Sequence, residues 1–552
     1  MKLIVGLCAI ATIFVGGLPS TAEPTPAYSP AHIDYPGTQI VYHVADSFPH
    51  FKSSLGYSAA PRLSSTDGKK TVDCSSLQDV NCDTNVVENL SATSILPNCI
   101  DISSTNCIES IEISNNSGEF IKTNFIREMG GYSIPGDLDK GLVAGRSAST
   151  WASDQVPHAG GSGSYLVTAQ LSSNWRPNKK KFIQQSIQVS VLPFLARKGD
   201  YAADRWLTDA ELDEVAKNSP QWVGYEKKFI PPVRQGPNRQ QDCFFYDDGY
   251  CGILYDFVEK SRVRAVLRIS NELGGWFKGR IQDPIISIQS IAGTKMNKLT
   301  IEGAVVRVPR MVFLQPWGKL TGDDEKNYVK YFWGGAPPSE LLAGPNSDMG
   351  DYAFDFIKTF RDKVNDTASG FTSMWNFSTI NAGQGSSCLT DTTKVLGVVT
   401  TNSMAYEGSA PRFVSGTLDY RVAGLHFAPD GKTEVKGTYD LIMRSETARC
   451  LYGFSSAPIS ATVSITSDRG ENSLATTQVS EENGWLKLGA YNFTYSNPTL
   501  KVRLTQVKAA SNEFAAPKIV KPSMKSIICL KGKSSKRVSG VNPKCPTGFK
   551  KK

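Results

Sequence analysis

The chain has 552 residues, 40% of them hydrophobic, and 60 Lys and Arg against 52 Asp and Glu give it a formal net charge of +8. This length is too great for one hydrophobic core, so we expect several domains. No stretch after residue 22 is apolar enough to predict a membrane span.

Residues 1–22 have the features of a signal peptide. Met1-Lys2 precedes an apolar run, Leu3 to Leu18, and Ser20-Thr21-Ala22 supplies the small residues that a signal peptidase requires. An uncleaved anchor is the alternative, but a membrane span needs about twenty apolar residues, more than this run offers. The sequence therefore predicts export, with cleavage after Ala22.

Ten cysteines remain after cleavage, and their spacing predicts five disulfides in an oxidising compartment. Three pairs lie eight residues apart, which lets a turn bring their Cα atoms to bridging distance. A zinc site is the alternative, but zinc cysteines lie about two to four residues apart and the histidines here are scattered. The expected bridges are Cys74 with Cys82, Cys99 with Cys107, Cys243 with Cys251, Cys388 with Cys450 and Cys529 with Cys545.

Residues 23–129 are rich in Ser, Asn, Thr and Pro, which, with two of these disulfides, predicts an irregular, disulfide-pinned N-terminal module. Residues 130–344 predict a first β domain. In Arg262–Ile269 the odd positions are apolar and three of the four even ones are arginine, as in a half-buried strand. Pro284 marks a strand start or an edge. A capping box at Thr208 and Glu211 predicts a short helix.

Residues 345–517 predict a second β domain. Apolar residues on one face predict a leading helix over Asp351–Asn365. Alternation then returns, and Pro429-Asp430-Gly431-Lys432 predicts a hairpin turn between two strands. Short strands without intervening helices favour antiparallel sandwiches over a parallel sheet.

The positive charge is concentrated at residues 518–552, which hold eleven basic residues and no acidic one. Residues 23–517 hold 48 Lys and Arg against 52 Asp and Glu, so the rest of the mature chain is mildly acidic. The pair Cys529 and Cys545 predicts a small basic hairpin that attaches to an anionic cell-wall polymer or to lipid head groups. A merely solubilising end is the alternative. The expected binding residues are Lys531, Lys533, Lys536, Arg537, Lys544, Lys550, Lys551 and Lys552.

Two segments of this tail, Ile528-Cys529-Leu530-Lys531-Gly532-Lys533 and Pro543-Lys544-Cys545-Pro546-Thr547-Gly548-Phe549-Lys550-Lys551-Lys552, carry a resemblance. They are similar to the Cys-x-Lys-Gly-Lys and Lys-Cys-Pro-x-Gly-[Tyr/Phe]-Lys-Lys-Lys ending of many exported proteins of small aquatic actinobacteria. Gly275–Arg280 and Ala448–Phe454 also resemble large, uncharacterised secreted proteins of that group. The resemblance implies a location outside the cell and brings no activity or catalytic residue with it.

No metal, cofactor or nucleotide motif occurs in the sequence, and we expect no catalytic, metal or cofactor site and no nucleic-acid partner. His158, beside a glycine run, and His426, between Leu425 and Phe427 in an expected strand, are the candidate bases; a loop position and a solvated strand face are the simpler interpretations. Asp247-Asp248 and Asp323-Asp324-Glu325 are candidate glycosidase carboxylates, provided that two of them lie about 5 to 9 Å apart in a cleft.

Two features are compatible with binding. Trp175, Trp317 and Trp333 are candidates for an aromatic platform against a glycan, and Arg262, Arg264 and Arg268 for a cationic comb on one sheet face. A core role for the tryptophans and a solvated face for the arginines are the alternatives.

The sequence as a whole predicts a secreted, cell-surface-associated, mainly β protein. It has two antiparallel β-sandwich-like domains with a few short helices, a pinned N-terminal module and a basic C-terminal hairpin. The predicted role is binding or structural, with a glycan as a possible ligand of the body. The alternative is a carbohydrate-active enzyme, a glycoside hydrolase that uses two carboxylates.

Overall fold

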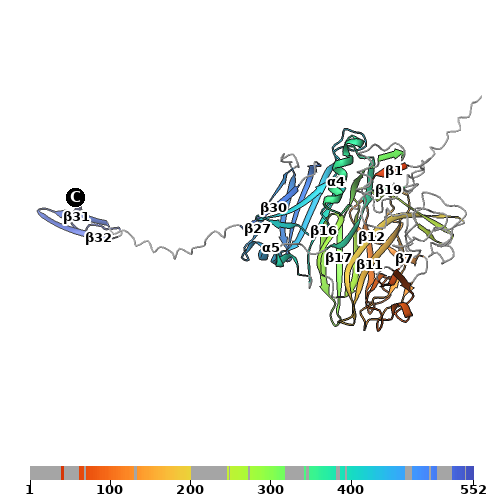
Figure 1. The fold of residues 1–552 in the computed structure, drawn as a ribbon. Coiled ribbons are helices and arrows are strands. Elements are labelled where there is room, and N and C mark those ends of the chain that lie inside the picture. The colour runs from red at the N-terminus through yellow and green to blue at the C-terminus, as the bar shows by residue number, and fades with distance from the viewer. Residues whose placement is uncertain are drawn as a thin grey trace, which may run out of the picture. The chain divides into compact units, whose positions relative to one another are not determined.

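The structure is a computed structural model (Figure 1). It describes residues 39–42, 61–67, 70–129, 133–199, 245–247, 249–270, 274–311, 313–316, 341–343, 347–380, 386–391, 394–466, 475–495, 499–506, 525–540 and 542–552. The chain divides into two compact units, Met1–Thr505 and Gln506–Lys552, called here the body and the C-terminal module. The predicted signal peptide and the helix predicted at Thr208 lie outside the described residues.

One long, almost entirely antiparallel sheet runs through the body. Its strands are β2 (Arg62–Asp67), β3 (Lys70–Cys74), β4 (Leu90–Ile95), β11 (Ser164–Arg176), β12 (Lys181–Lys198), β16 (Gly275–Ser290), β21 (Asn376–Ile380), β22 (Val395–Thr401), β26 (Lys436–Arg444), β28 (Thr476–Glu482) and β29 (Trp485–Thr494). Their order is β3-β2-β4-β11-β12-β21-β16-β22-β26-β29-β28, and β16 with β22 is the one parallel pair. The long sheet thus crosses the domain boundary expected at residue 344.

Two smaller sheets cover the long one and make the body sandwich-like, as predicted. The first is ordered β6-β5-β15-β17-β16, with β5 at Cys107–Ser114, β6 at Phe120–Lys122, β15 at Arg262–Ser270 and β17 at Met296–Arg310. The second is ordered β23-β25-β30-β27, with β24 beside β25. Its strands are β23 (Ala405–Tyr406), β24 (Arg412–Val414), β25 (Thr417–Ala423), β27 (Ile459–Thr466) and β30 (Thr499–Gln506).

The two smaller sheets lie on opposite faces of the long sheet. Adjacent strand residues point to opposite faces, and Phe277 packs in one core whereas Trp276 packs in the other. In β26, Ile442 likewise packs in the first of these cores and Leu441 in the second. The first core contains the alternating apolar residues of β15, which confirms the half-buried strand predicted at Arg262–Ile269. β16 and β26 therefore belong to both sandwiches.

Strand β16 changes sheets in its middle. Its first half pairs with β21 and β22 in the long sheet, and its second half pairs with β17 in the covering sheet. The register shifts between Gln282 and Ile285, and Asp283 has a positive φ of 48°. Pro284 thus lies at a bulge inside β16, whose second half is the outermost described strand of the covering sheet. The predicted edge position is confirmed and the predicted strand start is wrong, because a bulge also tolerates a residue that cannot donate to the ladder.

The predicted helix at 351–365 is present as α4 (Asp351–Phe360), followed by a 3-10 turn over Arg361–Val364. Its apolar face, including Phe356 and Phe360, is buried. The other α-helix of the described residues is α5 (Ser445–Tyr452), and no described helix is long and apolar enough to cross a membrane. The turn at Pro429–Lys432 also forms, with Gly431 at φ 65°, but β25 and β26 on either side enter different sheets.

Short strands complete the described body. β7 (Asn124–Glu128) and β10 (Ser149–Ala152) extend the long sheet beside β11, and β8 (Ser133–Ile134) pairs with β9 (Gly145–Arg146). β13 (Phe245–Asp247) and β14 (Tyr250–Leu254) lie beside the end of β12, and β20 (Gly370–Met374) lies beside the end of β17. β1 (Gln39–Tyr42) lies between β18 (Phe313–Pro316) and β19 (Leu341–Ala343).

Four of the five predicted disulfides are seen in the described residues: Cys74 with Cys82, Cys99 with Cys107, Cys388 with Cys450, and Cys529 with Cys545. Cys251 is also disulfide-bonded. Its predicted partner, Cys243, lies outside the described residues. The bridges bear out the prediction of a chain folded under oxidising conditions.

The C-terminal module is a small antiparallel sheet. Its central strand β31 (Lys525–Lys531) pairs with β32 (Ser534–Gly540) on one side and with β33 (Lys550–Lys551) on the other. The predicted hairpin is therefore present, with a third strand added. The bridge between Cys529 and Cys545 closes it, and Cys529 is fully buried.

Candidate functional site

The C-terminal module places every predicted binding residue at its surface. Lys531, Lys533, Lys536, Arg537, Lys544, Lys550, Lys551 and Lys552 are all exposed. Residues 518–552 contain no acidic side chain, so no carboxylate side chain within this stretch can neutralise the eight cations. The module is thus a compact, cross-linked unit with charge of one sign.

The two faces of this sheet differ. Residues paired across strands point to the same face, so Lys536 and Lys551 share the face of Cys529, onto which the disulfide brings Cys545. We call the opposite side the open face. It consists of Ser526, Ile528, Leu530, Ser535, Arg537, Ser539 and Lys550.

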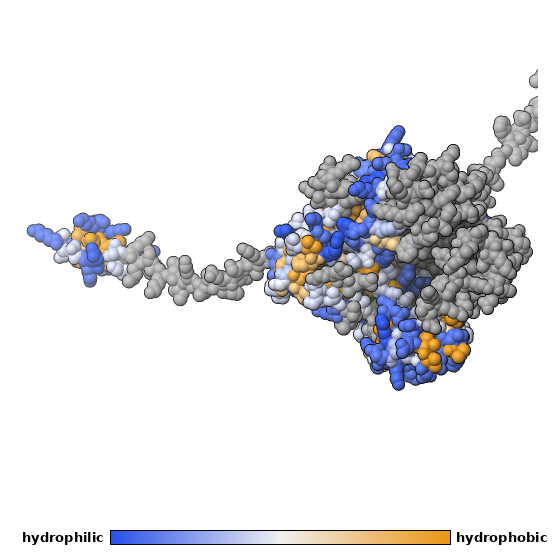
Figure 2. All heavy atoms as spheres, viewed as in Figure 1, coloured by the Kyte–Doolittle hydropathy of each residue, from blue (hydrophilic) through white to orange (hydrophobic). Residues whose placement is uncertain are grey.

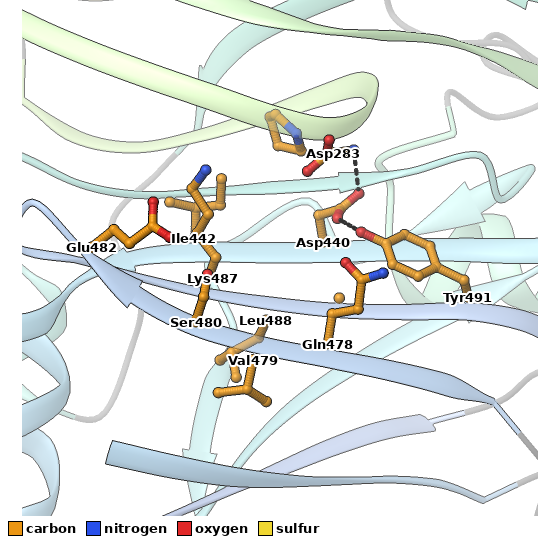
Figure 3. Close-up of a pocket in the computed structure, with 12 residues that line it drawn as sticks. Asp283, Asp440, Ile442, Gln478, Val479, Ser480, Glu482, Lys487, Leu488 and Tyr491 are labelled. Atoms are coloured by element: carbon orange, nitrogen blue, oxygen red, sulfur yellow. Dashed lines mark hydrogen bonds between the residues drawn. The ribbon is translucent and has the colours of Figure 1, made fainter. Parts of the chain in front are cut away.

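The body has a pocket of about 360 Å³ beside the kink of β16 (Figure 3). Strands β26, β28 and β29 form one wall with polar side chains, and Asp283 and Pro284 form the other. Gly489 leaves room for the Tyr491 ring, because a Cβ there would lie 2.5 Å from the hydroxyl of Tyr491. The other polar lining residues are Asp440, Gln478, Ser480, Glu482 and Lys487.

Asp440 is the buried acid of this pocket, with 4% of its surface exposed. Its carboxylate accepts hydrogen bonds from the Tyr491 hydroxyl and from the backbone N–H of Asp283 (3.1 Å) (Figure 3). It also accepts from Thr400 Oγ1 (3.3 Å). Burial raises the pKa of Asp440 to about 7, and these hydrogen bonds only partly oppose the effect. Burial and the neighbouring Asp440 also raise the pKa of Tyr491 far above its ordinary value.

Asp283 is the exposed acid of the same pocket. Arg262 of β15 holds it, with Nη1 3.3 Å from Asp283 Oδ2 and Nη2 donating to its carbonyl oxygen (3.2 Å). Asp283 also lines a second pocket of about 700 Å³, which includes Lys260, Arg307 and Lys436. The two pockets thus share Asp283 at the kink, and side chains of both charge signs line them.

The predicted cationic comb is neutralised within the protein. Arg264 donates to Glu302 (2.8 Å) and to Glu112 (2.7 Å), and Arg268 donates to Glu109 (2.8 Å). Arg262 is paired with Glu302 (3.1 Å) and with Asp283. These arginines therefore hold neighbouring strands together. The comb hypothesis is wrong because glutamates of the protein neutralise the arginines, and these glutamates come from other strands that lie far away in the sequence.

The candidate tryptophans and histidines do not form a site in the described residues. Trp175 is 6% exposed and packs on Phe182, so it belongs to the core. His158 lies in a loop as predicted but is buried, with Nε2 2.9 Å from the Phe194 carbonyl and Nδ1 accepting from Gly160 N. His426 lies between β25 and β26 and not in a strand, contrary to our prediction. Its side chain is half-buried and not fully solvated, because the ring packs against the chain with Nδ1 3.1 Å from the Tyr495 carbonyl.

None of the described residues that line this pocket belongs to the carboxylate clusters that we predicted. Asp247 is the last residue of β13, whereas Asp248, Asp323, Asp324 and Glu325 lie outside the described residues, as do Trp317 and Trp333. Sequence reasoning missed Asp440, Asp283 and Tyr491. One signal was available: Asp440 is the only charged residue within the run Tyr439–Met443.

Within the described residues, no three His, Cys, Asp or Glu side chains are grouped so that they could hold a metal ion. Comparisons with known proteins give no further guidance: no family model matches the chain, and no curated protein matches it.

Proposed function

We propose that this is an exported binding or structural protein, held at the cell surface by its C-terminal module, which binds anionic groups of the cell envelope. The observation that carries the proposal is the exposure of all eight predicted cations on a disulfide-closed sheet, without an acidic side chain in residues 518–552. Phosphate and carboxylate groups of wall polymers and of lipid head groups share the chemistry that such a surface attracts.

The contrast with the body supports this assignment. The three arginines of β15 are each within 3.1 Å of a glutamate, so their charge is satisfied internally. In the module, eight like charges repel one another on a small sheet that the disulfide holds closed. An anionic partner relieves this repulsion, whereas a solubilising tail needs neither a sheet nor a bridge.

Cell-surface retention tests the proposal. The full chain and a chain ending at residue 517 are produced in the same secreting cells, and the fraction on the cells is compared with that in the medium. We expect the full chain on the cells at low salt and the shortened chain in the medium. A variant with all eight cations changed to Gln should be released, whereas the matched variant with the seven lysines changed to Arg should be retained. Retention of the shortened chain would refute the proposal.

A second candidate function is glycan hydrolysis by two carboxyl groups. The observation that favours it is the position of Asp440 and Asp283 on one pocket, with the pKa of Asp440 raised by burial to about 7. A carboxyl group that keeps its proton near neutral pH can act as a general acid, with the second group as a nucleophile or base. Asp440→Asn and Asp283→Asn should each abolish release of reducing ends from a susceptible polysaccharide. Unchanged release would exclude these two groups as the catalytic pair.

A further inference from the structure

The open face of the C-terminal module carries two exposed aliphatic side chains, Ile528 and Leu530, among serines and cations. Ile528 and Leu530 are 39% and 37% exposed, although both lie in the central strand, with a neighbouring strand on each side. Figure 2 shows the same combination, with apolar and hydrophilic atoms next to each other on the surface of the module.

Each of these aliphatic residues lies beside cations. Ile528 is directly opposite Arg537 on β32, and Leu530 is directly opposite Lys550 on β33. The backbone N–H of Lys552 donates to the Ile528 carbonyl (2.9 Å), which places a third basic residue next to Ile528. Two adjacent aliphatic side chains, about 7 Å apart along the strand, are thus bordered by positive charge.

We infer that the open face docks on an anionic lipid bilayer, with Ile528 and Leu530 entering the interface and Arg537 and Lys550 on lipid phosphates. The inference rests on the proposed function and specifies the partner. A hydrated wall polymer satisfies the cations but leaves the aliphatic side chains in water. The open face has no aromatic ring for stacking on a sugar.

A bilayer interface satisfies both kinds of side chain. Apolar groups reach about 5 to 10 Å into the boundary between head groups and acyl chains. Arg and Lys stems lie along apolar surface while their charged ends stay at the phosphates. The opposite face, closed by the disulfide, keeps Lys536 and Lys551 exposed and adds long-range attraction without insertion.

Vesicle binding of the full chain tests the inference. The probes are vesicles of phosphatidylcholine alone, vesicles with about one third phosphatidylglycerol, and soluble polyphosphate as an anionic polymer without a bilayer. Ile528→Ser with Leu530→Ser removes the aliphatic pair and keeps every charge, while Ile528→Val with Leu530→Val keeps the aliphatic character. Leu138→Ser with Val414→Ser is the matched control, since both are exposed aliphatic residues of the body.

We expect the protein to bind the anionic vesicles and not the neutral ones. The double Ser variant should bind the anionic vesicles about tenfold more weakly, with unchanged affinity for polyphosphate, and the Val variant and the control should match the unmodified protein. Equal vesicle binding by the double Ser variant, or binding to polyphosphate without binding to vesicles, would overturn the inference and leave the proposed function standing. Binding to neither anionic probe would overturn both.

Discussion

Replacing Asp440 by Asn should make the body more stable at neutral pH, which is unusual for a buried polar residue. Asn can accept from Asp283 N and Thr400 Oγ1 with its oxygen while its Nδ2 donates to the Tyr491 hydroxyl. It thereby keeps all three partners of Asp440, with the direction of the Tyr491 hydrogen bond reversed. The substitution removes only the ability to ionise in a buried position.

The size of the effect follows from the difference in pKa between the folded and unfolded states. Burial raises the pKa of Asp440 from 3.8 to about 7, so the folded body binds this proton more tightly than the unfolded chain. Its contribution to stability is therefore fully present below about pH 4 and is lost as the pH rises through about 7. Three pKa units correspond to about 4 kcal/mol. Because buried sites relax toward a higher effective dielectric constant, we expect roughly half of this, about 2 kcal/mol.

Urea denaturation of the unmodified protein and of the Asp440→Asn variant, from pH 4 to pH 8.5, measures this difference. Other titrating groups contribute equally to both proteins and cancel. The variant should gain relative stability between about pH 4 and pH 7 and level off above that. A variant that is destabilised by the same amount at every pH would refute the reasoning and show that Asp440 is ionised in the folded protein throughout this range.

Three further predictions concern the framework of the body. Changing Cys388 and Cys450 together to Ser should lower the free energy of unfolding by about 4 kcal/mol, since the ring spans 62 residues; an unchanged urea midpoint would contradict this. Arg280→Met should destabilise by about 3 kcal/mol, because it leaves the Thr401 and Ser403 carbonyls without this buried donor, whereas Arg307→Met, at an exposed position, should change the same midpoint little. Non-reducing peptide mapping should recover Cys243 linked to Cys251, and a free thiol at either position would disprove that pairing.

Local sequence patterns predicted those strands and helices that have one face in the core and the other face among polar or charged groups. The alternation of β15 was readable because one face meets the core and the other meets ionised side chains. The α4 helix was readable for the same reason. The cysteine gaps of eight residues predicted bridges because short rings need only local geometry.

Contacts between residues far apart in the sequence could not be predicted from local patterns. The partners of Arg264 and Arg268, Glu112 and Glu109, lie 152 and 159 residues away, so a neutralised face looked like a free cationic comb. Asp283 N–H finds its acceptor, Asp440, 157 residues away, so a bulge looked like a strand start. The pairing of β12 with β21, across the boundary expected at residue 344, also joins residues that no local pattern connects.

The salt dependence of envelope binding tests the central claim most directly. Binding of the full chain to isolated cell envelopes is measured between about 20 mM and 1 M NaCl, over which the Debye length falls from roughly 20 Å to about 3 Å. Variants with two, four and eight of the exposed cations of the C-terminal module changed to Gln are compared. We predict that affinity falls steeply with salt and that the slope becomes shallower with each set of cations removed. Affinity that is independent of both salt and cation number would contradict attachment through the C-terminal module.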